Sequence, residues 1–184
     1  MAYINVPEGI PGIRSLVMFR PETGKSLYEL AQVLLRGPSP LTEAEREMIA
    51  TFVSNRNECK FCMSSHAAAA RHLLGEDAQL MDDVLNDYTT ASISDKMKAL
   101  LNIAGKVQIL GKEVKQPDID AARDAGANDL DIHDTVLIAA TFSMFNRYVD
   151  GLASLTPENR EDYVEMGKRL AEKGYVSPAS VPVV

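Results

Sequence analysis

The chain has 184 residues, a length that suits one globular domain with a hydrophobic core of its own. Hydrophobic residues make up 46% and charged residues 24% of the composition, so neither disorder nor a fibrous structure is indicated. The formal net charge of −7 argues against a surface for nucleic acid or anionic membranes, since both select clustered Lys and Arg. We therefore expect one domain over residues 1–184 with no nucleic-acid or membrane partner.

The N-terminal region lacks the basic start and apolar run of a secretory signal. No apolar stretch approaches the roughly 20 residues that are needed to span a bilayer. We therefore expect a cytoplasmic protein. In that compartment, closely spaced cysteines are more often catalytic or metal-binding than structural.

The first elements in chain order are predicted to be helices. Ser26 precedes a helical stripe of Leu and Ala residues that stops at Gly37, and two prolines then break the helix. Thr42 and Glu45 have the spacing of a capping box, which starts a second helix. The expected buried stripe of that helix is Met48, Ile49, Phe52 and Val53.

The rest of the chain continues the helical pattern, and strand signals are nearly absent. One helix begins at the two cysteines and closes at Gly75. A long apolar helix is expected after a cap at Asp131, and a last helix from Thr156 to Gly174. The remaining predicted helices lie within 80–85, 94–111 and 117–125. The fold class is therefore predicted to be all-α.

Two further expectations concern assembly and the C-terminus. The alanines at 67–70 favour close packing between helices, and the Ala-rich helical faces predict a homo-oligomer. The tail from about residue 177 contains two prolines and no helical period. We expect it to be flexible, or to form an arm on a neighbouring subunit.

The two cysteines are the strongest functional signal. Cys59 and Cys62 are the only cysteines in the sequence. On a helix, residues three apart share a face with Cα atoms about 5–6 Å apart, which lies within the range that a disulfide tolerates. The positive end of the helix dipole favours thiolate over thiol. The spacing therefore predicts a pair that cycles between dithiol and disulfide.

His66 follows Cys62 by one helical turn and projects from the same face. Histidine exchanges protons near neutral pH, so it suits a hydrogen bond or a one-water relay to that thiol. This spacing favours Cys62 as the activated cysteine and Cys59 as its resolving partner. Thioredoxin-type sites use the first cysteine instead, so the residues alone leave the assignment open.

A family resemblance now becomes visible. The sequence matches the pattern E-x(11)-C-x(2)-C-x(3)-H, with Glu47, Cys59, Cys62 and His66 at its four fixed positions. This pattern resembles the signature of AhpD-like alkylhydroperoxidases in the carboxymuconolactone decarboxylase superfamily. The surrounding sequence is similar as well, and the later segment 145–147 resembles the peroxidase-related branch. The similar surroundings are Leu41-Thr42, Glu45-Arg46-Glu47, Ser65-His66-Ala67-Ala68-Ala69 and Phe145-Asn146-Arg147.

The resemblance implies an all-α, AhpD-like helical bundle that reduces organic hydroperoxides with its CxxC pair. It implies that Glu47 and His66 form a proton relay and that Cys62 is the peroxidatic cysteine. A dithiol reductant, such as a lipoyl-type dithiol, resets the pair, and the chemistry needs no bound cofactor. Phe61 departs from the pattern, because the best-known members carry a histidine just before the second cysteine.

Three other functions compete with the peroxidase. A lyase of the decarboxylase type belongs to the same superfamily but does not depend on a CxxC. A redox sensor needs the cysteines without turnover. A metal site could use Cys59, Cys62 and His66, but a structural zinc needs four ligands, so His72, Glu47 or water would have to complete it. We expect His72 and His133 to be ordinary surface residues.

Overall fold

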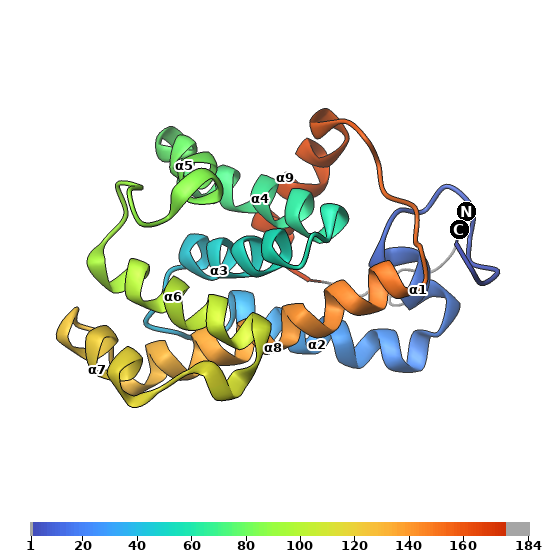
Figure 1. Cartoon of the computed structure of the whole chain (residues 1–184). Helices are drawn as coiled ribbons and strands as arrows, with labels where there is room; N and C mark the ends of the chain where they lie inside the picture. Colours follow the sequence, from blue (N-terminus) through green and yellow to red (C-terminus); the bar gives the residue numbers. More distant parts are fainter. Residues whose placement is uncertain (1, 176–184) are drawn as a thin grey trace.

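The computed structural model describes residues 2–175 and contains only helices within that range (Figure 1). The predicted all-α class is confirmed. The α-helices are α1 (Ile13–Phe19), α2 (Pro21–Arg36), α3 (Glu43–Arg56), α4 (Lys60–Leu74), α5 (Gln79–Asp87), α6 (Asp95–Ile109), α7 (Gln116–Asp124), α8 (Asp129–Gly151) and α9 (Val164–Lys173). The short 3-10 helices are η1 (Gly75–Asp77), η2 (Gly111–Glu113) and η3 (Arg160–Tyr163).

Helix α3 is the central element of the bundle (Figure 1). Helices α4, α6 and α8 pack against it, and α2 and α5 contact it less extensively. Its residues are buried without interruption from Arg46 to Ser54, rather than along the predicted stripe alone. A helix that is buried all round must provide partners for its polar groups. The site described below depends on this requirement.

The predicted capping box starts α3. The Thr42 hydroxyl accepts a hydrogen bond from the Glu45 amide at 3.2 Å, and Glu45 Oε2 accepts one from the Thr42 amide at 2.8 Å. Two free amides of the first turn are thereby satisfied. The prediction for this helix start is confirmed.

Three predicted helix starts are wrong. Helix α2 begins at Pro21 instead of Ser26, because proline fits the first helical position, where its missing N–H has no partner to lose. Helix α8 is capped by Asn128, and Asp131 is its capping-box partner three residues on. The last helix begins at Val164, after the 3-10 turn, instead of at Thr156. Helix α1 was not predicted at all.

Helices α4 and α9 pack closely because small residues face each other. A Cβ atom on Gly167 of α9 would lie 2.4 Å from the Ala68 Cβ and 2.8 Å from the Ala69 amide nitrogen. These alanines belong to the run that the sequence predicted to favour close packing. The same approach brings the α9 side chains toward the cysteine-bearing helix.

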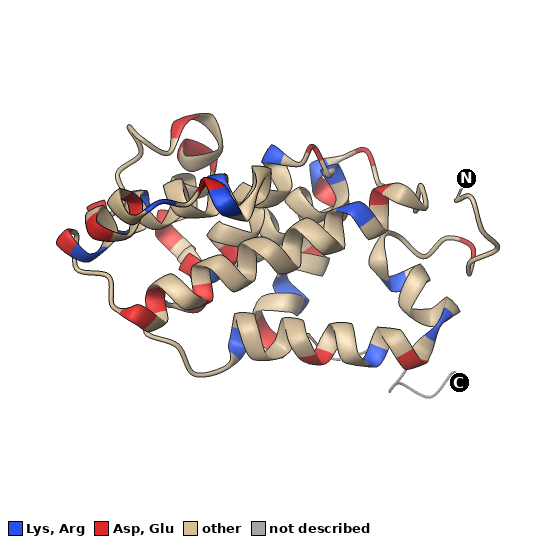
Figure 2. Cartoon of the chain, turned by 60° about the horizontal axis from the view of Figure 1, so that its bottom comes forward, with Lys and Arg blue, Asp and Glu red and all other residues tan. Residues whose placement is uncertain are grey.

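The remaining expectations concern the surface charge, a membrane-spanning helix and the C-terminal tail. In the view of Figure 2, Lys and Arg residues are scattered among Asp and Glu residues rather than gathered on one face. Within residues 2–175, no helix is long and apolar enough to cross a membrane. The predicted flexible or arm-like tail from about 177 lies outside the described residues.

Gly167→Ala should destabilise the protein, because the new methyl group meets backbone atoms of α4 that cannot move aside. We expect a loss of about 1–3 kcal/mol, the usual range for overpacking. Thermal unfolding followed by circular dichroism should show a Tm lower by roughly 2–10 °C. Gly151→Ala is the matched control, because a Cβ there would meet no atom within 4 Å. Equal Tm values for the two variants would contradict the close packing.

Candidate active site

The two cysteines lie where the chain turns from α3 into α4. Glu58 adopts a left-handed conformation with φ of 59°, and the Cys59 amide donates to the Ser54 carbonyl at 3.0 Å. Cys59 is the N-cap of α4, and Cys62 lies in its first turn. The predicted position of the CxxC at a helix start is therefore confirmed. Both cysteines are reduced and buried.

The two thiols have different surroundings. Both belong to one small apolar cluster that also contains Leu16 and Tyr163, and Cys59 is fully buried there, whereas Cys62 also lines the cavity described below. The pKa of Cys59 is raised far above its usual range, first by hydrogen bonding to the Cys62 side chain and then by burial. The expectation that the helix N-terminus favours the thiolate is wrong for this cysteine. Cys59 is therefore held as a neutral thiol.

Glu47 is the polar centre of the site. Its carboxylate is completely buried on α3 and receives three partners. Arg36 Nη2 of α2 donates to Oε1 at 2.5 Å, and the Tyr175 hydroxyl donates to the same oxygen at 2.6 Å. His66 Nδ1 of α4 lies 2.7 Å from Oε2. The predicted pairing of Glu47 with His66 is thus present in the structure.

These partners keep the buried carboxylate ionised. Burial alone would raise the pKa of Glu47, but the His66 ring and the Arg36 guanidinium, together with the Tyr175 hydroxyl, lower it below its usual range. Burial and the Glu47 charge raise the pKa of Tyr175 well above its usual range. Tyr175 is therefore a hydrogen-bond donor at neutral pH.

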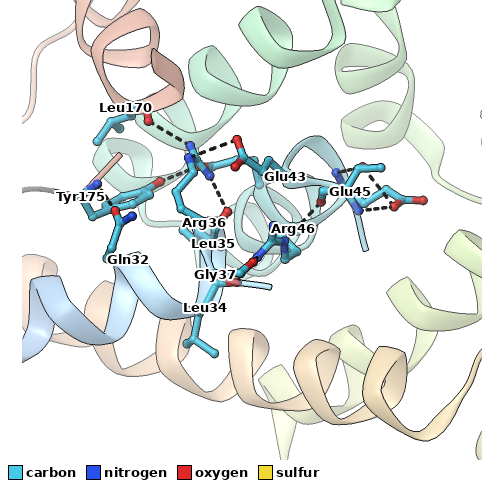
Figure 3. Close-up of polar contacts among 12 residues, drawn as sticks. Gln32, Leu34, Leu35, Arg36, Gly37, Glu43, Glu45, Arg46, Leu170 and Tyr175 are labelled. Atoms are coloured by element: carbon cyan, nitrogen blue, oxygen red, sulfur yellow. Dashed lines mark hydrogen bonds and ion pairs between the residues drawn. The ribbon is translucent and has the colours of Figure 1, made fainter. Parts of the chain in front are cut away.

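Arg36 is fixed by more than its ion pair (Figure 3). Its guanidinium also donates to the Leu170 carbonyl at 3.1 Å and to the Leu35 carbonyl at 2.7 Å, and it lies 5.2 Å above the Tyr175 ring centroid. Burial lowers the pKa of Arg36, but the Glu47 charge and hydrogen bond, together with Tyr175 and Glu43, raise it above its usual value. The ends of α2 and α9 are thereby fastened to α3.

The His66 ring is held between aromatic side chains. Tyr175 stacks on it with ring centroids 5.8 Å apart, and Phe142 of α8 meets it edge-on at 4.6 Å. Because Nδ1 faces the Glu47 carboxylate, that atom carries the proton in the neutral ring. The other ring nitrogen, Nε2, is then an acceptor. His66 is the only one of the three histidines with a buried ionic partner in the described chain.

A small cavity of about 50 Å³ joins His66 to one cysteine only. Cys62 and His66 both line it, whereas neither Cys59 nor Glu47 does. Most of the wall is apolar and comes from five helices and the Tyr175 segment.

The structure also shows what the sequence reasoning missed. Arg36 and Tyr175 complete the environment of Glu47, yet neither was a predicted site residue. Arg36 lies directly before the predicted helix stop at Gly37, and Tyr175 follows the last helix by two residues. The predicted surface character of His72 and His133 is confirmed, since both are exposed.

Phe61 and Asn146 have structural explanations. The Phe61 ring packs so closely on Gly12 that a Cβ there would lie 2.0 Å from it. Asn146 is buried and links α8 to α3 by donating to the Ser54 hydroxyl at 2.9 Å. In the described part of the chain, no three His, Cys, Asp or Glu side chains form a group that could hold a metal ion. The metal alternative has no support from this geometry.

Comparison with known proteins places this arrangement in a family. Residues 21–106, which include the four predicted site residues, match the carboxymuconolactone decarboxylase family. A peroxidase-related protein of uncharacterised function from Silicibacter sp. TM1040 is 30% identical, with a TM-score of 0.75, and the alignment covers 84% of this chain and 79% of that one. The chain belongs to the carboxymuconolactone decarboxylase family.

Two further crystal structures are similar. The alkylhydroperoxidase AhpD core of an uncharacterised peroxidase-related protein from Ralstonia eutropha JMP134 is 28% identical with a TM-score of 0.76, covering 86% of this chain and 82% of that one. A protein of unknown function from Agrobacterium tumefaciens, 19% identical with a TM-score of 0.70, shares the fold over 86% of this chain and all of that one. The comparison with curated proteins finds no similar sequence. The predicted AhpD-like fold is confirmed.

Arg36→Met should be strongly destabilising, because it leaves the Glu47 carboxylate buried with one partner fewer. We expect a loss of about 3–5 kcal/mol in the free energy of unfolding. Combining it with Glu47→Gln should cost less than the sum of the two single changes. Urea unfolding followed by circular dichroism suits a chain without tryptophan.

The matched control for that series is Arg123→Met, which removes an exposed pair with Asp129. We expect it to change the free energy of unfolding by less than about 1 kcal/mol. Simple additivity of Arg36→Met and Glu47→Gln would show that the two side chains are not coupled.

The pKa of Glu47 also predicts how stability depends on pH. Because this pKa is lower in the folded state, the ionised carboxylate contributes stability above the unfolded value of about 4.3. That contribution is lost as the pH falls through the folded pKa. The difference in unfolding free energy between wild type and Glu47→Gln should therefore be largest near neutral pH and shrink below pH ~4. A difference that stays constant from pH 7 to pH 3 would contradict the assignment.

Proposed function

We propose that the protein is a thiol-dependent peroxidase that reduces organic hydroperoxides through Cys62 and Cys59. The observation that carries the proposal is the shared cavity: Cys62 lines it together with His66, whose Nδ1 is occupied by the ionised Glu47. The nucleophile Cys62 thus lies in one cavity with the base His66, and Glu47 orients that base. The relation to peroxidase-related proteins supports the same reaction.

The first step oxidises Cys62. His66 Nε2 accepts the thiol proton, and the thiolate sulfur attacks the terminal oxygen of the hydroperoxide. The S–O bond forms as the O–O bond breaks, and the departing alkoxide takes the proton back from His66. The products are one alcohol and a sulfenic acid on Cys62. Glu47 stabilises the ring while it carries the positive charge.

The second step closes the disulfide. The Cys59 sulfur attacks the Cys62 sulfenic acid, the S–O bond breaks, and water leaves. The raised pKa of Cys59 keeps this thiol from competing for the hydroperoxide. Its first cause, the Cys62 thiol, is gone once Cys62 is a sulfenic acid, and the Cys59 proton then leaves with the hydroxyl group as water. An external dithiol then reduces the disulfide by exchange and becomes oxidised itself. A lipoyl-type dithiol is the class of donor that we propose, in a cytoplasmic homo-oligomer.

The cavity also indicates the class of hydroperoxide. Most of the surface that its wall exposes is apolar, which favours an alkyl group over a fully hydrated peroxide. Helix α8 supplies Phe142 and Phe145, and α9 supplies Met166 and Leu170. An organic hydroperoxide therefore fits better than hydrogen peroxide.

Cysteine variants test the mechanism directly. One equivalent of tert-butyl hydroperoxide should remove both thiols of the reduced wild type, as measured with a thiol reagent. Cys59→Ser should stop at a sulfenic acid on Cys62, which dimedone traps. Cys62→Ser should lose at least about a thousandfold in rate, because the remaining thiol of Cys59 is fully buried and lies outside the cavity.

The same variants separate the peroxidase from the lyase of the family. A decarboxylase-type lyase does not use the thiols, so its activity would survive Cys62→Ser. Ser64→Ala is a suitable control, because this residue lies two positions from Cys62 but does not line the cavity. Equal rates of hydroperoxide consumption in wild type and both cysteine variants would overturn the proposal.

A further inference from the structure

The wall of the cavity contains a second sulfur-bearing side chain. Among the residues that line the cavity, Cys62 and Met166 are the two that carry sulfur. Met166 belongs to α9 and is half-buried, and it packs against both the main core and the small cluster that contains the two cysteines. The peroxidase mechanism oxidises Cys62 and does not use Met166. A hydroperoxide that enters the cavity therefore meets two oxidisable side chains.

Ser65 fixes the position of the Met166 sulfur. The Ser65 hydroxyl lies 3.3 Å from Sδ of Met166 and 2.8 Å from the Phe61 carbonyl oxygen, so it can donate to either atom. Ser65 is buried on α4, between Cys62 and His66 in the sequence, and it lines the same cavity. The thioether is thus held against the turn of α4 that carries the proposed nucleophile and its base.

The other methionines of residues 2–175 have different positions. None of them lines the cavity, whether it is buried in the core, half-buried or exposed: Met18, Met48, Met63, Met81, Met97 and Met144. Met144 of α8 is the most exposed of this group, with 44% of its surface accessible. Exposure to solvent and exposure to the cavity therefore belong to two different methionines of the same chain, which can be compared directly.

We propose that Met166 is an oxidative modification site, which a hydroperoxide in the cavity converts to the sulfoxide when Cys62 is not available as a thiol. Sδ attacks the terminal peroxide oxygen, the S–O bond forms as the O–O bond breaks, and the peroxide proton passes to the departing alkoxide. The products are one alcohol and one methionine sulfoxide, so no further oxidant or reductant is needed. A reduced Cys62 reacts first, because a thiolate is a stronger nucleophile than a thioether.

Oxidation of Met166 should lower peroxidase activity. It converts a flexible apolar side chain into a polar one within a mainly apolar wall, and the added oxygen takes up part of a cavity of only about 50 Å³. The sulfoxide oxygen also competes with the Phe61 carbonyl for the Ser65 hydroxyl. Sulfoxide accumulates when the dithiol reductant is scarce and the disulfide persists. This consequence rests on the proposed peroxidase function, whereas the modification requires only that the hydroperoxide enters the cavity.

Mass spectrometry of the Cys62→Ser variant tests the site without peroxidase turnover. Trypsin releases Met166 in peptide 161–168 and Met144 in peptide 124–147, and neither peptide has a second methionine. In urea-unfolded protein, tert-butyl hydroperoxide should oxidise both at similar rates. In folded protein, the ratio of the Met166 rate to the Met144 rate should be about tenfold or more higher, because the cavity holds the hydroperoxide beside Sδ. A ratio at or below the unfolded value, which burial alone predicts, would refute the site.

The wild type provides the same measurement with an unchanged sequence. Diamide first converts its cysteines to the disulfide, and tert-butyl hydroperoxide should then give the same ratio of Met166 to Met144 oxidation as in the Cys62→Ser variant. Hydrogen peroxide is the matched probe without an alkyl group, and it should give a ratio several-fold lower because the apolar wall does not retain it. Equal ratios for the two peroxides would show that Met166 is not oxidised from within the cavity.

Activity after oxidation tests the consequence. Disulfide-form protein is treated with excess tert-butyl hydroperoxide, freed of it, reduced with dithiothreitol and assayed against the untreated sample of the same variant. We expect kcat/KM of the wild type to fall by about fivefold or more, because a polar group now lies in an apolar wall. Met166→Leu keeps a similar volume and should lose far less, whereas Met144→Leu should lose as much as the wild type. Equal losses in wild type and Met166→Leu would overturn the predicted effect.

The outcomes separate this proposal from the peroxidase proposal. If no hydroperoxide is turned over but Met166 is oxidised selectively, the peroxidase proposal fails and the modification site stands. If hydroperoxide is turned over but Met144 is oxidised faster than Met166, the modification site is refuted and the peroxidase proposal stands.

Discussion

The buried carboxylate of Glu47 is the constraint on which the rest of the structure depends. A charge at the centre of a helical bundle is costly unless it is paired and hydrogen-bonded. Arg36, His66 and Tyr175 meet this requirement from α2, α4 and the segment after α9. The same contacts therefore fasten four parts of the chain together and orient the one buried histidine. Because Glu47 both stabilises the fold and orients His66, substituting it changes stability and chemistry together.

This arrangement gives the two cysteines different environments although they are only three residues apart. Cys62 opens onto the cavity beside His66, whereas Cys59 is fully buried outside the cavity lining and is held as a neutral thiol. This difference suits a reaction in which Cys62 reacts with the hydroperoxide and Cys59 then reacts with the oxidised Cys62.

Local signals in the sequence predicted much of this structure, and long-range contacts account for the rest. The capping box at Thr42 and the cysteines at the start of α4 depend on residues within one helical turn, so their spacing was sufficient. Glu47 and His66 were found through a fixed pattern across one short link. Arg36 and Tyr175 reach Glu47 from distant parts of the chain, and no periodicity reports such a contact. The helix starts at Pro21 and Val164 were missed because proline and a 3-10 turn also occur in loops.

The central claim is that Glu47 holds the His66 ring with its proton on Nδ1, so that Nε2 is the base for Cys62. Nitrogen-15 NMR of the imidazole rings tests this claim directly, and with three histidines in the chain each can be assigned by substitution. In the neutral ring of His66, the account predicts a protonated Nδ1 and an unprotonated Nε2, with the preference lost in Glu47→Gln. A neutral His66 ring protonated on Nε2 in the wild type would contradict the account.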